Sequence, residues 1–364
     1  MKPLRWGILS TAGIARKNWR AIRDSGNCIV TAVGSRDLSR GSEFIESCQS
    51  AVPFETPPAA FGSYEAFLAS PNVDAVYIPL PTGLRKQWVL RAAAAGKHIL
   101  CEKPCGLNAE DVREMIAACA QHRVQFMDGV MFMHNPRMNR IREILDEERH
   151  VGRVKRITSL FAFRAVEDFF RDNIRIHSEL EPTGCLGDLG WYCIRFALWT
   201  LNWRLPETVS GRILSQRGST LSPGPAPTDF SGELIFDDET SAGFFCSFLT
   251  EKQQWAEISG KKGSLRIPDF VHPQNEHEPA FELNGRDEPV RICNCPGDHD
   301  DSRDVAQDSA MFRHFAEQVR SGKLNEDWPM WALKTQQVTD ACFASAQKHC
   351  DVPVQAPSIV PPVK

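Results

Sequence analysis

The chain has 364 residues, about the length of two domains, and can bury a sizeable core without disulfides or metals. Its apolar fraction of 42%, charged fraction of 24% and net charge of −4 are ordinary for a globular protein and argue against a uniformly basic nucleic-acid surface. No uncharged apolar run approaches the roughly 18 residues of a membrane span, and the N-terminal apolar stretch ends too early, at Arg16, for a secretory signal.

Strand and helix patterns alternate through the first 130 residues. Strands are expected at Leu4–Leu9, Ile29–Val33, Val73–Ile78, Lys97–Cys101 and Val124–Met127, and helices at Ile14–Asp24, Leu84–Ala95 and Ala109–His122. Continuous apolar strands separated by helices are typical of a doubly wound parallel sheet whose strands are buried on both faces. We therefore predict an α/β fold with a first domain over residues 1–130.

The first strand leads into a turn of small residues, Gly7–Ala15, and then a helix. A dinucleotide site needs this unit, because small residues let the backbone approach the pyrophosphate and the helix N-terminus supplies free N–H groups. Ser10, Ala12 and Ala15 stand at the three glycine positions of the usual fingerprint, so a turn that only packs tightly is the alternative. The candidate cofactor-binding residues of this turn are Ser10, Thr11, Ala12, Gly13 and Ile14.

The second strand ends in basic residues. Ser35 and Arg36 follow it directly, and Arg40 comes four residues later. Arginine pairs well with the 2′-phosphate of NADP, and serine adds a hydrogen bond, so the pattern favours NADP over NAD. NAD binding stays possible through Asp37, and a solvated helix start is the third interpretation.

Two segments carry the residues best suited to chemistry. Lys103 follows the strand Lys97–Cys101, and in a parallel sheet the carboxyl ends of the strands face the ligand crevice. Asp188 and Tyr192 are four residues apart and would share one face of a helix. A solvated lysine, a helix cap and a core tyrosine are the alternatives. The chain has only three tyrosines, and the patterns place Tyr64 at an ordinary helix start and Tyr77 inside a buried strand, which leaves Tyr192 as the candidate phenol.

The pattern changes after about residue 150 to strands at hairpin spacing. Strands are expected at Thr208–Ser215, Gly232–Phe236, Ala242–Phe248, Trp255–Ser259 and Gly263–Ile267, with further alternation at Ile157, Ser159, Phe161 and Phe163, and helices at Ala306–Arg320 and Met330–His349. Asp237–Thr240 is expected to form a hairpin loop and Ser222–Thr228 a loop. These elements predict a second α/β domain over residues 131–364, with a large, open and mostly antiparallel sheet.

The twelve cysteines are scattered through the expected helices and strands, which is typical of reduced thiols in a cytoplasmic protein. The densest group is Cys293 and Cys295 with His299. A zinc site would need a fourth ligand at a recognisable spacing, and none is evident, so we expect no metal.

Several motifs together resemble one known family over nearly the whole chain. They are Trp6–Ala12, Ser35-Arg36, Ile78–Pro81, Ala94–Pro104, Asn173–Arg175, Asp188-x-Gly190-x-Tyr192 and Lys262–Pro268. They resemble the Gfo/Idh/MocA oxidoreductases, and within them the NADP-dependent dihydrodiol and D-xylose dehydrogenase branch. The resemblance implies a Rossmann domain, and then an α/β domain whose open sheet commonly mediates dimerisation. It also implies a homodimer or higher homo-oligomer with a sugar or polyol substrate.

The resemblance also implies roles for individual residues. Lys103 would contact the cofactor and the reacting hydroxyl, Tyr192 would be the general acid/base, and Asp188 would position the substrate. Apart from the resemblance, the sequence offers Arg175 as a candidate substrate contact, and Met131, His134, Arg164 and His177 could also line the pocket. For His134, a place at a helix start is the favoured alternative. The cofactor side would be completed by Pro79, Pro81, Thr82 and Glu102. This chain departs from the branch at Thr82–Arg85 and in the loop Glu181–Gly187, both on the substrate side, so the substrate stays open.

The predicted chemistry is reversible hydride transfer between the nicotinamide and a secondary alcohol. A free tyrosine has a pKa of about 10, and a neighbouring ammonium such as Lys103 is expected to favour the phenolate. A non-catalytic NAD(P)-binding regulator is the alternative. NAD-dependent glycoside hydrolysis is less favoured, because that branch usually has histidine in place of Tyr192.

Overall fold

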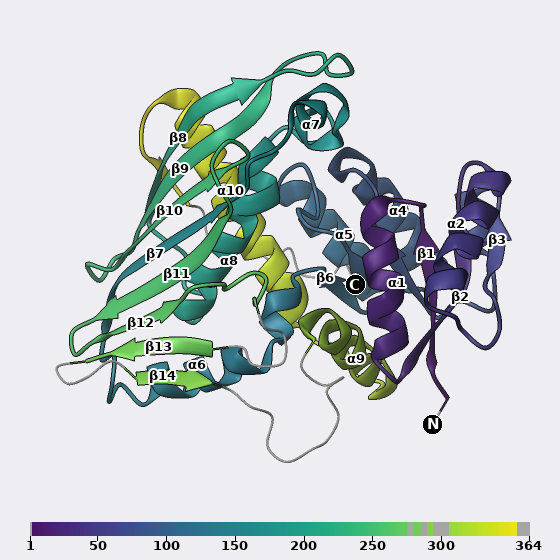
Figure 1. The fold of residues 1–364 in the computed structure, drawn as a ribbon, viewed down its shortest axis with the longest axis horizontal. Coiled ribbons are helices and arrows are strands. Elements are labelled where there is room, and N and C mark those ends of the chain that lie inside the picture. Colours follow the sequence, from purple (N-terminus) through teal and green to yellow (C-terminus); the bar gives the residue numbers. More distant parts are fainter. Residues whose placement is uncertain (1, 275–279, 286–289, 294–305, 355–364) are drawn as a thin grey trace.

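The computed structural model describes residues 2–274, 280–285, 290–293 and 306–354. They form two sheets with helices packed against each (Figure 1). Among the described residues, every helix is too short or too polar to span a membrane. No disulfide joins the ten cysteines whose side chains the structure describes, and nine of these ten are buried.

The first sheet has six parallel strands in the order β3-β2-β1-β4-β5-β6, the order of a dinucleotide-binding domain. Its strands are β1 (Leu4–Leu9), β2 (Cys28–Gly34), β3 (Ala59–Phe61), β4 (Ala75–Ile78), β5 (His98–Cys101) and β6 (Phe126–Asp128). Its helices are α1 (Gly13–Asp24), α2 (Leu38–Ala51), α3 (Tyr64–Leu68), α4 (Thr82–Ala94) and α5 (Ala109–Gln121). The predicted doubly wound parallel sheet is confirmed, and the elements expected in it agree with the observed bounds to within two residues. β3 and α2 were not among the expected elements.

Local sequence explains how these elements begin and pack. The side chains of Asp37, Ser63 and Asn108 each accept a backbone N–H bond at the start of a helix. Gly7 lies against the Phe67 ring, so closely that a Cβ there would lie 2.4 Å from the ring. A glycine in β1 therefore lets α3 approach the sheet.

The second sheet has nine strands in the order β14-β13-β12-β11-β7-β10-β9-β8-β15, and only β7 and β10 pair in parallel. The strands are β7 (Val154–Ala162), β8 (Thr208–Arg217), β9 (Ala226–Ile235), β10 (Ser241–Ser247), β11 (Gln253–Gly260), β12 (Ser264–Ile267), β13 (Ala280–Asn284), β14 (Val290–Cys293) and β15 (Val352–Pro353). The predicted large, mostly antiparallel sheet is confirmed. Its strand β9 begins within the segment Ser222–Thr228, which was expected to be a loop, and β13 and β14 were not predicted.

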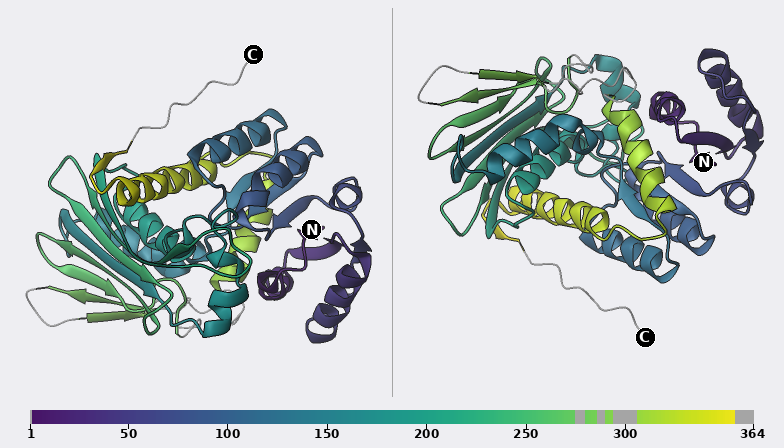
Figure 2. Two further views of the ribbon diagram at one scale, coloured as in Figure 1. Left: turned by 90° about the horizontal axis from the view of Figure 1, so that it is seen from above. Right: turned by 90° about the horizontal axis from the view of Figure 1, so that it is seen from below.

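Helices cover the face of this sheet that is turned toward the first domain (Figure 2). They include α8 (Trp191–Thr200), which packs on β7 and β10, and α10 (Asp327–Lys348), which packs on β8. The other helices of this half are α6 (Pro136–Asp146), α7 (Glu167–Asp172) and α9 (Gln307–Arg320), and α9 packs against α1 of the first domain. Short turns of helix occur at η1 (Met131–His134), η2 (Ile174–Ile176) and a π-helical turn, η3 (Leu186–Gly190). The last helix starts three residues before the predicted Met330.

The two C-terminal helices return to the first domain. Phe312 of α9 packs edge-on against Trp6 of β1 at a centroid distance of 5.0 Å. At the start of α5, the Ala109 N–H donates to Asp340 of α10 at 2.6 Å. The second half of the chain therefore braces the first sheet, and side chains from the two halves meet in one site.

Candidate active site

A cavity of about 830 Å³ lies between the two halves of the chain. The first half contributes, among others, Gly13, Pro81 and Lys103, and the second contributes Arg175, Asp188 and Tyr192. The cavity opens at the carboxyl ends of β1, β4 and β5, where a doubly wound sheet binds its ligands. The structure therefore brings the predicted catalytic residues together.

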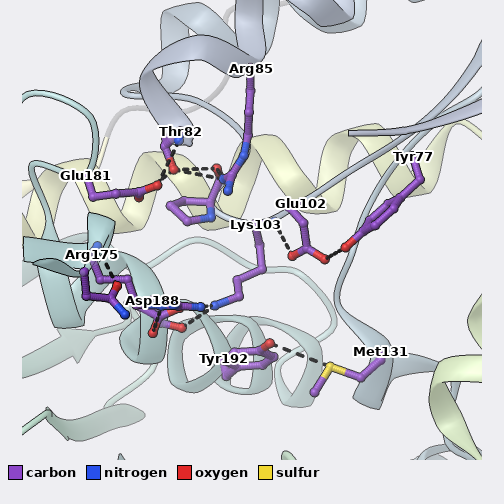
Figure 3. A network of polar contacts seen from close by, with 12 residues as sticks. Tyr77, Thr82, Arg85, Glu102, Lys103, Met131, Arg175, Glu181, Asp188 and Tyr192 are labelled. Atoms are coloured by element: carbon purple, nitrogen blue, oxygen red, sulfur yellow. Dashed lines mark hydrogen bonds and ion pairs between the residues drawn. The ribbon is translucent and has the colours of Figure 1, made fainter. Parts of the chain in front are cut away.

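An ion cluster of residues that line this cavity joins the two halves (Figure 3). The Lys103 ammonium donates to Asp188 Oδ1 at 2.7 Å and to the Asp188 carbonyl at 2.6 Å. Arg175 Nε lies 2.6 Å from Asp188 Oδ2. Burial alone would raise the pKa of Asp188, but Arg175 and Lys103 hold that pKa well below its usual range. Asp188 is therefore a carboxylate at neutral pH.

The segment that carries Asp188 and Tyr192 is not a continuous α-helix. Asp188 lies in the π-helical turn η3, and Tyr192 lies in the first turn of α8. Close packing holds the turn, because a Cβ on Gly187 would lie 2.2 Å from Thr183 Oγ1. Both side chains nevertheless reach the cavity, so the predicted common face is preserved by a different backbone.

The environment of the Tyr192 phenol differs from the expectation. Lys103 Nζ lies 4.7 Å from the centre of the Tyr192 ring, over its face, while the hydroxyl donates to Met131 Sδ at 3.7 Å. Burial, with the carboxylates of Glu102 and Asp188, raises the pKa of Tyr192 well above its ordinary value. The expected net lowering of this pKa by Lys103 is therefore not found, and the ammonium bonds to Asp188 and not to the phenol oxygen.

A second phenol, that of Tyr77, contacts Glu102 next to Lys103, and the sequence analysis did not predict this contact. Tyr77 at the end of β4 donates its hydroxyl proton to Glu102 Oε1 at 2.5 Å and accepts from Asn18 Nδ2 at 2.5 Å. Glu102 Oε2 in turn accepts the Lys103 backbone N–H at 3.3 Å. This chain of bonds fixes the Glu102 carboxylate at the cavity wall, so Tyr77 has a polar task as well as a place in the core.

Thr82 does not line the cavity in this structure, although the resemblance implied that it would. Its N–H donates to Glu181 Oε1 at 2.8 Å and its hydroxyl to Glu181 Oε2 at 2.6 Å. Buried Arg85 donates to the Leu80 carbonyl at 2.7 Å and to Thr82 Oγ1 at 2.9 Å. The two segments in which this chain departs from its branch therefore bind each other across the two halves.

The predicted phosphate turn has the geometry of an anion cradle. Ser10, at a position where the fingerprint has glycine, takes a φ of 141° and accepts the Ala12 N–H at 3.0 Å. No side chain caps α1, and a Cβ on Gly13 would meet nothing within 4 Å. The N-terminus of α1 is therefore uncapped by any side chain and has open space beside Gly13, which fits a pyrophosphate.

The end of β2 fits a 2′-phosphate better than a ribose hydroxyl. Asp37 Oδ1 accepts the Ser39 N–H at 2.9 Å and the Ser39 hydroxyl at 2.7 Å, so this carboxylate caps α2. The Ser35 hydroxyl accepts the Asp37 N–H at 3.3 Å. Arg36 and Arg40 are exposed, and neither has an ion pair within the described part of the chain. Two guanidinium groups without ion pairs in the described structure thus lie where the 2′-phosphate of NADP would bind.

Only one of the other residues predicted to line the substrate pocket does so. Met131 lines the cavity, whereas Arg164, His134 and His177 do not. Arg164 lies exposed 3.7 Å from Glu251, His134 faces His314, and His177 accepts backbone N–H bonds from its own loop. Sequence reasoning missed the wall formed by the second sheet, whose side chains at the cavity include Phe161, Phe163, Lys252 and His272.

No metal centre is found among the residues that the structure describes, because no group of three or more potential ligands comes together there. The segment 294–305, which contains Cys295 and His299, lies outside the described residues.

Comparison with known proteins follows the same two-part division. A family model described as "Oxidoreductase family, NAD-binding Rossmann fold" matches residues 4–130. A second, described as "GFO/IDH/MocA C-terminal domain", matches residues 138–266. D-xylose 1-dehydrogenase (NADP(+)) 2 of Haloferax volcanii is 33% identical over 78% of this chain and 82% of its own. Trans-1,2-dihydrobenzene-1,2-diol dehydrogenase of Mus musculus is 33% identical over 74% of this chain and 76% of its own.

Solved structures share the fold. An aldose-aldose oxidoreductase from Caulobacter crescentus superposes with a TM-score of 0.83 at 21% identity, covering 97% of this chain and all of that one. A point mutant of a 3-ketoreductase from Actinomadura kijaniata, solved with TDP-benzene and NADP, gives a TM-score of 0.80 at 23% identity over 94% of this chain and 98% of its own.

Proposed function

The chain belongs to the Gfo/Idh/MocA family of oxidoreductases, and we propose that it transfers hydride reversibly between NADP(H) and a secondary alcohol of a sugar or other polyhydroxy compound. The observation that carries this proposal is the meeting of Lys103 with Asp188 and Tyr192 beside the uncapped start of α1. The names of the two curated relatives, both dehydrogenases of hydroxyl compounds, support the same reaction class.

NADP supplies the hydride acceptor when it is bound. The uncapped first turn of α1 would hold its pyrophosphate, and Arg36 and Arg40 would hold its 2′-phosphate. Asp37 Oδ1 already accepts the N–H groups of Ser39 and Arg40 at the start of α2, and these bonds hold the carboxylate in its capping position. These contacts support NADP as the preferred cofactor, as do relatives named for NADP.

The protein's own task is to move a proton at the reacting oxygen. Oxidation of a carbinol requires that the hydroxyl proton leaves as the hydride leaves the carbon, and reduction of a ketone requires the reverse. Tyr192, with its raised pKa, holds its proton at neutral pH and is ready to donate it to a carbonyl oxygen. Lys103 supplies the nearby positive charge that stabilises a developing alkoxide.

The decisive experiment is the variant Tyr192→Phe, which removes only the phenol oxygen. We expect kcat in either direction to fall by about 100-fold or more, because a positioned general acid contributes that much. NADP affinity, measured by calorimetry, should stay within about twofold. Unchanged kcat would sink the proposed role. A protein that binds NADP but oxidises no member of a broad sugar and polyol panel would instead support the non-catalytic regulator.

Dimerisation and cytoplasmic location complete the proposal. The face of the nine-stranded sheet opposite the helices is the surface we propose for a homodimer (Figure 2). Light scattering behind a sizing column would report twice the chain mass of 40.8 kDa. The buried cysteines without disulfides in the described structure support a cytoplasmic location for the protein.

A further inference from the structure

The second sheet presents two polar side chains to the cavity that the proposed reaction does not use, Lys252 and His272. Lys252 immediately precedes β11, where Gln254 pairs with Phe161 of β7. The Gln254 side chain then holds the His272 backbone, accepting its N–H at 2.8 Å and donating to its carbonyl at 2.6 Å. One glutamine thereby fixes the two groups at the same end of the sheet.

The acidic side chains along the cavity are all paired, whereas one basic side chain has no counter-ion within the described part of the chain. Its acidic side chains all have partners: Glu102 and Tyr77, Asp172 and Arg171, Glu181 and Thr82, Asp188 and Lys103, and Asp308 and Lys17. The exposed Lys252 ammonium, by contrast, has no counter-ion among the residues that the structure describes. Within those residues, the cavity thus offers a free cation and no free carboxylate.

The unused hydrogen-bonding groups nearby are also mainly donors. Asn173 Oδ1 accepts the Arg175 N–H at 3.0 Å, which leaves its side-chain NH2 free. Arg175 contacts Asp188 through Nε, which leaves its two terminal nitrogens available. The His272 ring has no hydrogen bond within the described structure and packs at 6.1 Å from the Phe161 ring. A group that only accepts hydrogen bonds would suit this wall.

The electrostatic field at His272 agrees with that interpretation. Burial, together with the positive charges of Lys17, Lys252 and Lys103, lowers the pKa of the imidazole to about 4. Asp188 has a smaller, opposing effect. The ring is therefore neutral at pH 7 and sits in a net positive field. A bound anion would reduce that field.

We propose that Lys252 and His272, with the free donors of Asn173 and Arg175, form a subsite for an anionic group of the substrate, a carboxylate or a phosphate. The inference rests on the proposed function, because it assumes that the carbinol to be oxidised lies near Tyr192 in the same cavity. It narrows the substrate class from polyhydroxy compounds in general to those that carry a negative charge. The phosphates of NADP have separate binding groups on the first domain, at α1 and at Arg36 and Arg40.

The test uses three compounds that differ at one carbon: D-glucose, D-glucuronate and D-glucose 6-phosphate. With enzyme loaded with NADPH, which cannot accept a hydride from the sugar, calorimetry should detect tighter binding of at least one anion than of glucose, and the tighter anion identifies the charge type. In Lys252→Gln that preference should fall by about 10-fold, since one charge-assisted hydrogen bond is lost. Lys252→Arg should retain it. Lys261→Gln, at the other end of β11 and equally exposed, is the matched control.

Two results would overturn the inference. One is equal binding of glucose and both anions in the parent protein. The other is a Lys252→Gln variant that weakens NADP binding and leaves the anion preference intact, which would assign the lysine to the cofactor. Because binding is measured without turnover, either result leaves the proposed hydride transfer standing, and loss of turnover in Tyr192→Phe remains its separate test.

Discussion

Lys103 and Asp188 join the two halves of the molecule through one ammonium, which donates to both the carboxylate and the backbone carbonyl of the same residue (Figure 3). The lysine follows β5 of the first sheet, and the aspartate lies in the π-helical turn η3. Their side chains are 8% and 14% exposed, so the pair is shielded from water and its geometry matters. The pair fixes the position of the Lys103 ammonium beside the Tyr192 ring.

Asp188→Asn should therefore weaken both stability and activity. The variant keeps the shape but leaves Lys103 and Arg175 without their counter-charge, and loss of one partner of a buried pair costs about 3 kcal/mol. The folded-state pKa of Asp188 is lowered, so its contribution is present above the unfolded pKa and lost as the pH falls through the folded one. Denaturant unfolding should show the parent's advantage over the variant shrinking below about pH 4. A pH-independent advantage would contradict this account.

The raised pKa of Tyr192 predicts different pH profiles for the two directions of reaction. Oxidation needs a phenolate to accept a proton, so its kcat should rise as the pH goes from 7 into the alkaline range. Reduction needs the phenol, so its kcat should stay flat over the same range and decline only above the raised pKa. Steady-state rates in both directions from about pH 6 to about pH 10 test this. An oxidation rate that levels off near neutral pH would show that bound cofactor lowers the phenol pKa.

Cofactor preference should depend on the two arginines after β2. Replacing Arg36 with alanine removes a guanidinium that fits the 2′-phosphate, and we expect the KM for NADP to rise by about 10-fold or more while the KM for NAD changes little. Arg20→Ala, an exposed arginine on α1, serves as the control. If both KM values rise together, Arg36 stabilises the fold of the cofactor domain and does not bind the 2′-phosphate.

The first domain was predictable because its strands are buried on both faces. Leu4–Leu9 was expected with the bounds that the structure shows, since a run of apolar residues ended by a small-residue turn leaves little choice of element. The sheet edge formed by β13 and β14 gave no comparable signal, because short edge strands lack a continuous apolar run. Lys103, Asp188 and Tyr192 were identifiable from their motifs, and the structure brings them together.

Contacts between segments that lie far apart in the sequence could not be predicted from the sequence alone. Tyr77 was expected to be a core residue because it lies in a buried strand, yet its hydroxyl reaches Glu102, which follows the neighbouring strand, and this contact depends on the register of β4 and β5. The pairing of Lys103 with Asp188, which withdraws the ammonium from the phenol oxygen, likewise depends on how the two halves dock. Such features follow from tertiary geometry, and no local pattern encodes them.

The bond between Glu181 and Thr82 provides the last prediction. Glu181, from the loop before η3, binds both the N–H and the hydroxyl of the first residue of α4, and thus serves as a helix cap supplied by the other half of the chain. Glu181→Gln keeps one acceptor oxygen and replaces the other with a donor, which should cost about 1 to 2 kcal/mol. Glu179→Gln, exposed in the same loop, should cost almost nothing. Because the loop that carries Glu181 leads directly to Asp188, substrate KM should rise in Glu181→Gln as the loop loosens, and an unchanged KM with lowered stability would confine Glu181 to a structural cap.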